Sequence, residues 1–158
     1  MKLRNSHCYR CIRTYGLALL SLACLFLVTT QSHAGSKEFG EFQVHWSVFP
    51  STFLSPEVAR DNDLNRSRSI GVVNISIMRE TGDGGLQPVS GQVEGKALND
   101  VQQSKFLGFR RVKEGDAVYF IAEYQYSNAE LMTFQITARP TGSKQDLPIR
   151  FSQTLFND

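Results

Sequence analysis

Cysteine is missing from most of this chain: the three cysteines, Cys8, Cys11 and Cys24, all stand near the N-terminus. Residues 35–158 hold no thiol, which excludes disulfide bonds and thiolate metal sites from that part. Histidine is nearly as scarce there, with His45 alone. A zinc site normally needs three or four His, Cys or carboxylate ligands. We therefore expect packing to stabilise residues 35–158, and we expect no metal or other cofactor.

Acidic residues are missing from the first 34 residues, which carry four basic residues and then an almost wholly apolar run over 17–28. The segment ends in Ser32-His33-Ala34. A basic segment, a short apolar run and small residues at the −3 and −1 positions predict a signal peptide, cleaved between Ala34 and Gly35. The apolar run is shorter than the roughly 20 residues that span a bilayer, so cleavage is favoured over retention as an anchor. We expect residues 1–34 to be removed and 35–158 to form one periplasmic or secreted domain.

Two cysteine patterns in the predicted signal peptide are typical of other chemistry. Cys24 follows Ala23 as in a lipoprotein, but Ser21 stands where Leu is usual and the apolar run continues beyond it. The pair Cys8-x-x-Cys11 resembles a redox or metal motif, yet it would leave with the signal. Four of the 17 basic residues leave too while all 15 acidic residues stay, which gives a net charge of about −2. This charge argues against binding to nucleic acid or to anionic membranes. Cleavage of the signal peptide would leave no stable membrane anchor.

Alternating apolar and polar residues dominate the rest of the chain, and helical periodicity is nearly absent. Phe42, Val44 and Trp46, for example, alternate with polar side chains, as in a strand with one buried face. The pattern predicts seven strands, at residues 42–48, 73–77, 89–97, 106–112, 118–126, 130–139 and 149–156. Gly91 and Gly95 in the third strand suggest a bulge or a sheet edge. We expect an all-β fold, an immunoglobulin-like antiparallel β-sandwich, with a small barrel as the alternative.

The connection between the first two predicted strands, residues 51–69, is long for a compact domain. Ser55 suits an N-cap, Pro56 the first helical position and Glu57 the positive end of the helix dipole, so one or two helical turns are expected. Connections of this length are functional loops or crossovers between sheets. We name this segment the 51–69 loop.

The candidate binding residues lie in this loop or on the strand before it. They are Thr52, Phe53, Glu57, Arg60, Arg66, Arg68 and His45. Guanidinium groups can hold a carboxylate, a phosphate or a sulfated sugar, although arginines more often serve as solvated surface charges. Loops on a rigid sandwich commonly carry recognition. We expect a non-enzymatic binding or interaction module whose partner is an envelope protein or a small anionic ligand.

Two alternatives stay open. A chaperone-like envelope protein would pair with its clients through an exposed edge strand. A small hydrolase would use His45 as a general base together with a carboxylate such as Glu123, although a lone histidine on a strand is more often structural.

One family resemblance covers essentially all of residues 35–158. Residues 49–60 read FPSTFLSPEVAR and residues 73–77 read VNISI, and both resemble the DUF4426 family of uncharacterised secreted bacterial proteins. Further support comes from Arg66-Ser67, Pro88-Val89, Phe109-Arg110, Ala122 and residues 151–158. The resemblance implies a periplasmic β-sandwich and supplies no catalytic residues.

Overall fold

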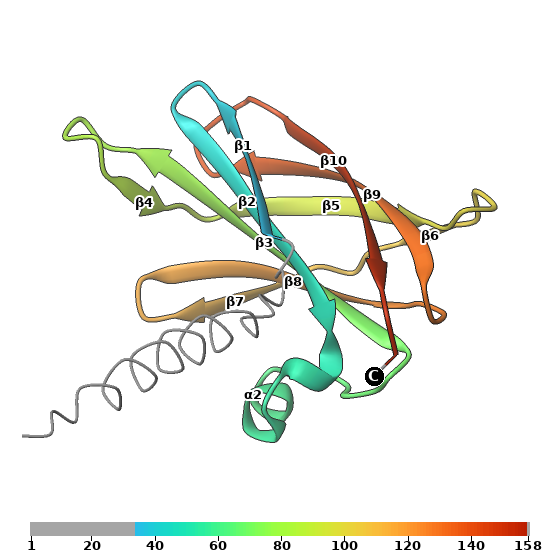
Figure 1. The fold of residues 1–158 in the computed structure, drawn as a ribbon. Coiled ribbons are helices and arrows are strands. Elements are labelled where there is room, and N and C mark those ends of the chain that lie inside the picture. The colour runs from blue at the N-terminus through green and yellow to red at the C-terminus, as the bar shows by residue number, and fades with distance from the viewer. Residues whose placement is uncertain (1–33, 158) are drawn as a thin grey trace, which may run out of the picture. The chain divides into compact units, whose positions relative to one another are not determined.

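The computed structural model describes residues 34–157 and shows two antiparallel sheets packed face to face (Figure 1). Sheet A holds β1 (Ala34–Phe39), β2 (Phe42–Pro50), β3 (Ile70–Glu80), β4 (Leu86–Pro88), β7 (Arg110–Glu114) and β8 (Ala117–Gln125). Sheet B holds β5 (Gly91–Leu98), β6 (Ser104–Phe106), β9 (Glu130–Pro140) and β10 (Leu147–Leu155). Between β2 and β3 lie the 3-10 helix η2 (Ser51–Phe53) and the helix α2 (Pro56–Asp61). No helix among these residues is long and apolar enough to cross a membrane.

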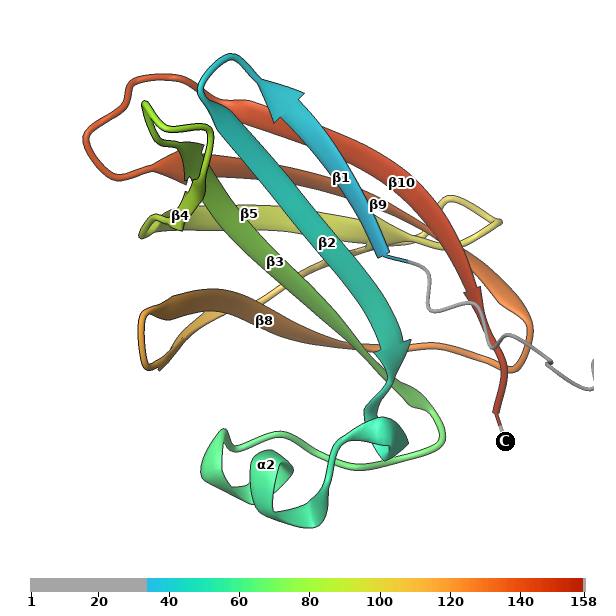
Figure 2. The same ribbon diagram turned by 60° about the vertical axis from the view of Figure 1, so that its left-hand side comes forward.

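The strand order is that of an immunoglobulin domain. Sheet A runs β1-β2-β3-β8-β7 with β4 paired to β3, and sheet B runs β10-β9-β5-β6 (Figure 2). Lettered A to G in chain order, the corresponding strands are β2, β3, β5, β7, β8, β9 and β10. Their spatial order is then A-B-E-D in sheet A and G-F-C in sheet B, as in a constant-type immunoglobulin domain. The predicted all-β sandwich is confirmed, and the alternative of a small barrel is excluded.

The strands differ from the sequence prediction in three places. One is β4, a three-residue strand that pairs with β3 and was not predicted. The strand β1 was not predicted because residues 34–39 lack apolar alternation, yet it pairs with β2 along its whole length. The strand predicted over residues 106–112 is two strands, since β6 ends sheet B at Phe106 and β7 starts in sheet A at Arg110. The residues between them therefore carry the chain from one sheet to the other.

The strand β5 pairs with β9 along its whole length but with β6 only over residues 96–98. Gly91 and Gly95 therefore lie where β5 has a strand partner on one side only among the described residues, which agrees with the expected sheet edge. A Cβ atom on Gly91 would lie 2.3 Å from the carbonyl oxygen of Arg139, and one on Gly95 would lie 2.7 Å from that of Gln135. Both distances are too short for a side chain. The glycines let the β9 backbone come close to β5.

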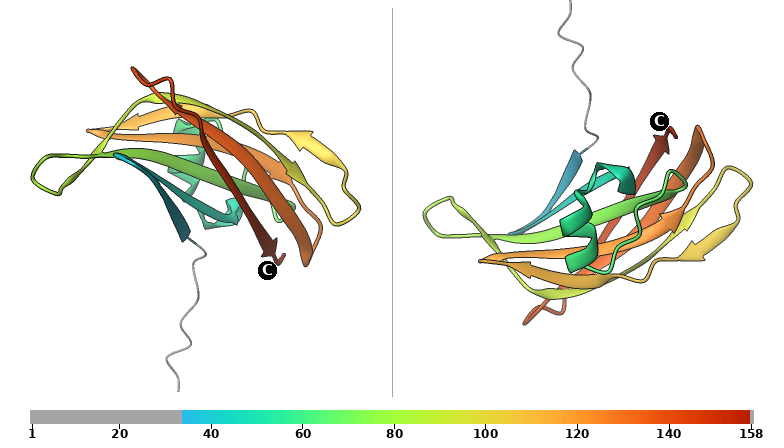
Figure 3. Two further views of the ribbon diagram at one scale, coloured as in Figure 1. Left: turned by 90° about the horizontal axis from the view of Figure 1, so that it is seen from above. Right: turned by 90° about the horizontal axis from the view of Figure 1, so that it is seen from below.

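The 51–69 loop connects β2 to its neighbour β3 within sheet A, so the alternative that it crosses between sheets is also wrong. We call the face of each sheet that points away from the other sheet its outer face. Figure 3, seen from below, shows α2 lying against the outer face of sheet A. The loop therefore covers one end of a sheet instead of linking two layers.

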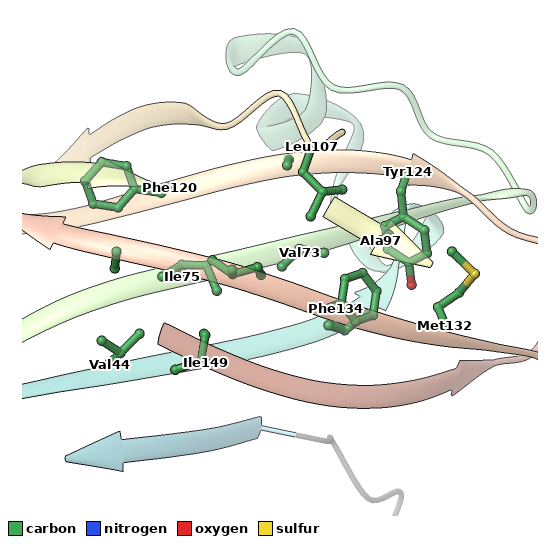
Figure 4. Packing of buried hydrophobic residues seen from close by; sticks show 14 of the residues in the cluster. Val44, Val73, Ile75, Ala97, Leu107, Phe120, Tyr124, Met132, Phe134 and Ile149 are labelled. Atoms are coloured by element: carbon green, nitrogen blue, oxygen red, sulfur yellow. The ribbon is translucent and has the colours of Figure 1, made fainter. Parts of the chain in front are cut away.

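Four aromatic rings in contact join the two sheets. Trp46 of β2 stacks on Phe151 of β10 at 5.1 Å between ring centroids, and Phe151 stacks on Phe134 of β9 at 5.0 Å. Phe134 in turn meets Tyr124 of β8 edge to face at 5.0 Å (Figure 4). Such ring pairs contribute about 0.5–1.5 kcal/mol each beyond the area they bury. This aromatic series links sheet A to sheet B in a part of the chain that has no cysteine.

At the end of this series, the Tyr124 hydroxyl lowers the free energy of unfolding, because it is buried without a hydrogen-bond partner among the described residues. Tyr124→Phe removes that hydroxyl, and we expect it to raise the free energy of unfolding by about 1 kcal/mol or more. Tyr126→Phe is the matched control, since its hydroxyl donates to the carbonyl oxygen of Phe156 at 3.4 Å. Its loss should lower stability. Urea unfolding of both variants measures whether each substitution raises or lowers the free energy of unfolding. Destabilisation by Tyr124→Phe would contradict the conclusion that its hydroxyl is buried without a partner.

The same hydroxyl makes stability depend on alkaline pH. Burial raises the pKa of Tyr124 above its ordinary value of 10.0. Above that pH the unfolded chain loses the Tyr124 proton while the folded chain keeps it, so the free energy of unfolding falls as pH rises. Tyr124→Phe should lessen this fall.

Candidate functional site

Both ends of the 51–69 loop meet at Ser51. This serine is fully buried, with 0% of its surface exposed. Its Oγ donates to the carbonyl oxygen of Ser67 at 3.1 Å and accepts from the Ser67 N–H at 2.8 Å. Beside it, Nη2 of Arg66 donates to the carbonyl oxygen of Thr52 at 3.1 Å. Residues 51 and 67 are thus held together, and the segment between them forms a closed surface loop of the Ω type.

A second anchor comes from Glu123 on β8. Its Oε1 accepts a hydrogen bond from the N–H of Asn65 at 2.6 Å, and its Oε2 accepts one from Nη2 of Arg110 at 3.1 Å. The other guanidinium nitrogen of Arg110 donates to the carbonyl oxygen of Asp63 at 2.9 Å. Hydrogen bonds to charged groups contribute about 1.5–3 kcal/mol, and less when water reaches the pair. This network ties the middle of the loop to sheet A.

The helix α2 forms as the sequence predicted. The Ser55 Oγ accepts a hydrogen bond from the N–H of Val58 at 3.2 Å, and Pro56 occupies the first turn. Ala59 and Leu64 are buried. Val72 is buried as well, although it alternates along β3 with Val73, which belongs to the core between the sheets. Because no second sheet of the described residues lies over that outer face, we attribute the burial of Val72 to the 51–69 loop.

The 51–69 loop exposes apolar and charged side chains to solvent. Phe53 is 71% exposed and Val58 46%. Glu57 and Arg68 are exposed, and neither makes a hydrogen bond or an ion pair with the described residues. Arg60 lies 3.8 Å from Asp61, an exposed pair that contributes little. A backbone held by hydrogen bonds thus exposes two apolar side chains as well as charged ones.

The structure separates His45 from the other six candidates. His45 lies on the outer face of β2, where its Nε2 is 2.8 Å from Oε1 of Gln43. It lines a hollow of about 150 Å³ together with Ser47, Asn74 and Ser76, and no residue of the 51–69 loop lines that hollow. Alternation along β2 points it outward, but the loop begins only after β2 has ended.

His45 and Glu123 do not form the acid–base pair of the hydrolase hypothesis. The strand registers place His45 opposite Ser76 of β3 and Glu123 opposite Val72 of β3. Four residues along a strand span roughly 13 Å, and β3 itself separates the two side chains. Among the described residues, no three His, Cys, Asp or Glu side chains gather as a set of metal ligands.

The anchoring role of Glu123 was missed by the sequence analysis, which considered this residue only as a catalytic partner. One feature of the sequence indicates this role. Glu123 is the only charged residue between Val118 and Tyr126, in a strand of mainly apolar and aromatic residues. A lone carboxylate there needs a partner. Which partner it has depends on the packing of the loop and on β7.

Glu123→Ala should free the middle of the loop and leave the sandwich intact. We expect the amide of Asn65 to exchange with solvent at least about tenfold faster, because it loses a charge-assisted hydrogen bond. The amides of β3 and β9 should keep their protection. Glu57→Ala is the control, since that exposed carboxylate has no partner among the described residues. Equal exchange at Asn65 in both variants would argue against the anchor.

Comparison with known proteins places the chain in a family without assigning an activity. A crystal structure of a DUF4426 family protein from Pseudomonas aeruginosa PAO1 is similar with a TM-score of 0.70 and 33% identity, covering 79% of this chain and 96% of that one. FetP of uropathogenic E. coli strain F11, expressed recombinantly in the periplasm of E. coli, has a TM-score of 0.58 over 80% of this chain and 97% of its own. At 7% identity, FetP shows the shared fold alone. No curated protein matches.

The model of the family "Domain of unknown function (DUF4426)" matches residues 36–158. The resemblance seen in residues 49–60 and 73–77 is therefore confirmed over residues 36–158. This chain belongs to the DUF4426 family.

Proposed function

We propose that this protein is a non-enzymatic binding or interaction module that acts in the periplasm or outside the cell, and that the 51–69 loop is its contact surface for an envelope protein. One observation carries the proposal. The loop is fixed to the sandwich by buried Ser51 and by Glu123, yet it leaves Phe53 71% exposed. A large aromatic side chain costs free energy in water and gains it when a partner covers it.

The rest of the loop fits the composition of a protein contact. Val58 adds a second apolar side chain, while Glu57, Arg60 and Arg68 supply polar groups around it. Protein interfaces commonly combine an apolar centre with a polar rim, and aromatic and arginine side chains carry much of their binding energy. Because the backbone is already held by hydrogen bonds, little ordering entropy is lost on binding.

The proposed compartment rests on the signal peptide predicted for residues 1–34, which lie outside the described residues except for Ala34. The family match begins at residue 36, directly after the start predicted for the mature chain at Gly35. Residues 35–157 hold no cysteine, so the fold does not depend on the redox state of its compartment.

The chaperone-like alternative finds less support. In the described part of the chain, β10 pairs only with β9 and offers the longest sheet edge, nine residues. That edge carries Pro148, and Nζ of Lys37 donates to the Pro148 carbonyl oxygen at 3.3 Å. Proline and lysine at an edge are features that protect a sheet from pairing with another strand.

Photo-crosslinking in cells that make the protein tests the proposed surface. A photoreactive benzoylphenylalanine in place of Phe53 should give one discrete crosslinked species in the envelope fraction. Adding Val58→Ser and Arg68→Glu should reduce that species about tenfold, because apolar contact and charge are both lost. The control carries the same photoreactive residue at Val101, which is 67% exposed and lies between β5 and β6.

The control position should give no discrete species. A crosslink from position 53 that survives the two added substitutions would refute the proposed surface. So would a crosslinking pattern that is the same at positions 53 and 101.

A further inference from the structure

A depression of about 850 Å³ crosses sheet B, far along the chain from the 51–69 loop. Its lining includes side chains that the strand registers place in one row. Arg150 of β10 is opposite Gln135 of β9, Gln135 is opposite Lys96 of β5, and Lys96 is opposite Phe106 of β6. Residues opposite each other in neighbouring strands point to the same face. Ile136 and Ile149, the sequence neighbours of Gln135 and Arg150, belong to the core between the sheets. Because side chains alternate along a strand, the row lies on the outer face of sheet B.

The depression is positively charged although the domain as a whole is not. Lys37, Lys96 and Arg150 line it, and Glu94 is the one carboxylate in the lining. Glu94 is held by Nη2 of Arg139 at 2.8 Å, which offsets its charge. Lys96 and Arg150 make no ion pair with the described residues. Two cations of a net acidic domain are therefore left without a counterion in one place.

The row is also arranged for an anionic group. The backbones of Arg150 and Lys96 are two strand spacings apart, roughly 9–10 Å, with Gln135 between them. Long side chains at this separation can converge on one carboxylate or sulfonate, to which the amide of Gln135 can donate a third hydrogen bond. Gln135 makes no side-chain hydrogen bond with the described residues.

The end of the row at β6 is apolar. Phe106 is 90% exposed, the largest exposed fraction of any large apolar side chain in the described part of the chain. It lines the depression together with Leu107. A flat apolar group lying against Phe106 would cover this ring while an attached acidic group reached Lys96.

We propose that this depression binds a small organic anion, in which an acidic group held by Arg150, Gln135 and Lys96 is joined to a flat apolar body that packs on Phe106. The volume is within the range of roughly 300–1,000 Å³ typical of small-molecule sites. This site is separate from the protein-contact surface proposed for the 51–69 loop, and each stands without the other.

Two fluorescent probes with the same ring system test the proposal on the purified protein. Anilinonaphthalene sulfonate carries an acidic group on aromatic rings, and phenylnaphthylamine has the rings without the acid. The sulfonate should bind at one site and move the amide resonances of Lys96, Gln135 and Arg150. The uncharged probe should bind at least about tenfold more weakly, the loss expected for charge-assisted contacts.

Matched variants locate the site. Lys96→Gln with Arg150→Gln should weaken binding of the sulfonate about tenfold or more, and Phe106→Ala should weaken both probes. The control, Phe53→Ala with Arg68→Gln, removes the same kinds of group from the 51–69 loop and should leave binding unchanged. Equal affinity for the two probes, resonance shifts elsewhere, or loss of binding in the control variant would each overturn the proposal.

Discussion

Phe134 contacts one aromatic ring of each sheet, Tyr124 of sheet A and Phe151 of sheet B. The sandwich depends on those contacts because the described residues contain no cysteine to join the sheets. It lies on β9, the counterpart of strand F, which antibody domains link to strand B by a disulfide. Here Phe134 stacks with Phe151 of its own sheet and meets Tyr124 of the other, and Phe151 continues the contact to Trp46. Ring packing thus takes the place of a covalent link, which makes the fold independent of an oxidising compartment.

The rigid sandwich gives its surface features their geometry. The aromatic series fixes β8 against sheet B, and β8 carries Glu123 on its outer face. Glu123 in turn binds the N–H of Asn65 and positions Arg110 against Asp63. On the opposite sheet, the register of β10, β9 and β5 aligns Arg150, Gln135 and Lys96. The row across sheet B thus follows from strand pairing, and the position of the 51–69 loop follows from the hydrogen bonds of Ser51 and Glu123.

Alternation of apolar and polar residues was enough to predict the sandwich, because that period directly records which side chains face the core. It was not enough at residues 106–112, where β6 and β7 share one apolar run but belong to different sheets. The glycines of β5 indicated the part of that strand that β6 does not cover, but not the close approach of β9, because that is a tertiary contact. The helix cap at Ser55 was predicted because capping is local. The role of Glu123 and the row across sheet B were not, since both depend on residues distant in sequence.

The central claim is that aromatic packing around Phe134 holds the two sheets together in place of a disulfide. Equilibrium unfolding in urea of Phe134→Ala against Phe106→Ala tests it directly, because the two substitutions remove the same ring from a buried and an exposed position. The account predicts that Phe134→Ala lowers the free energy of unfolding by about 3–5 kcal/mol. Phe106→Ala should change it by less than about 0.5 kcal/mol. Similar small losses in both variants would contradict the claim.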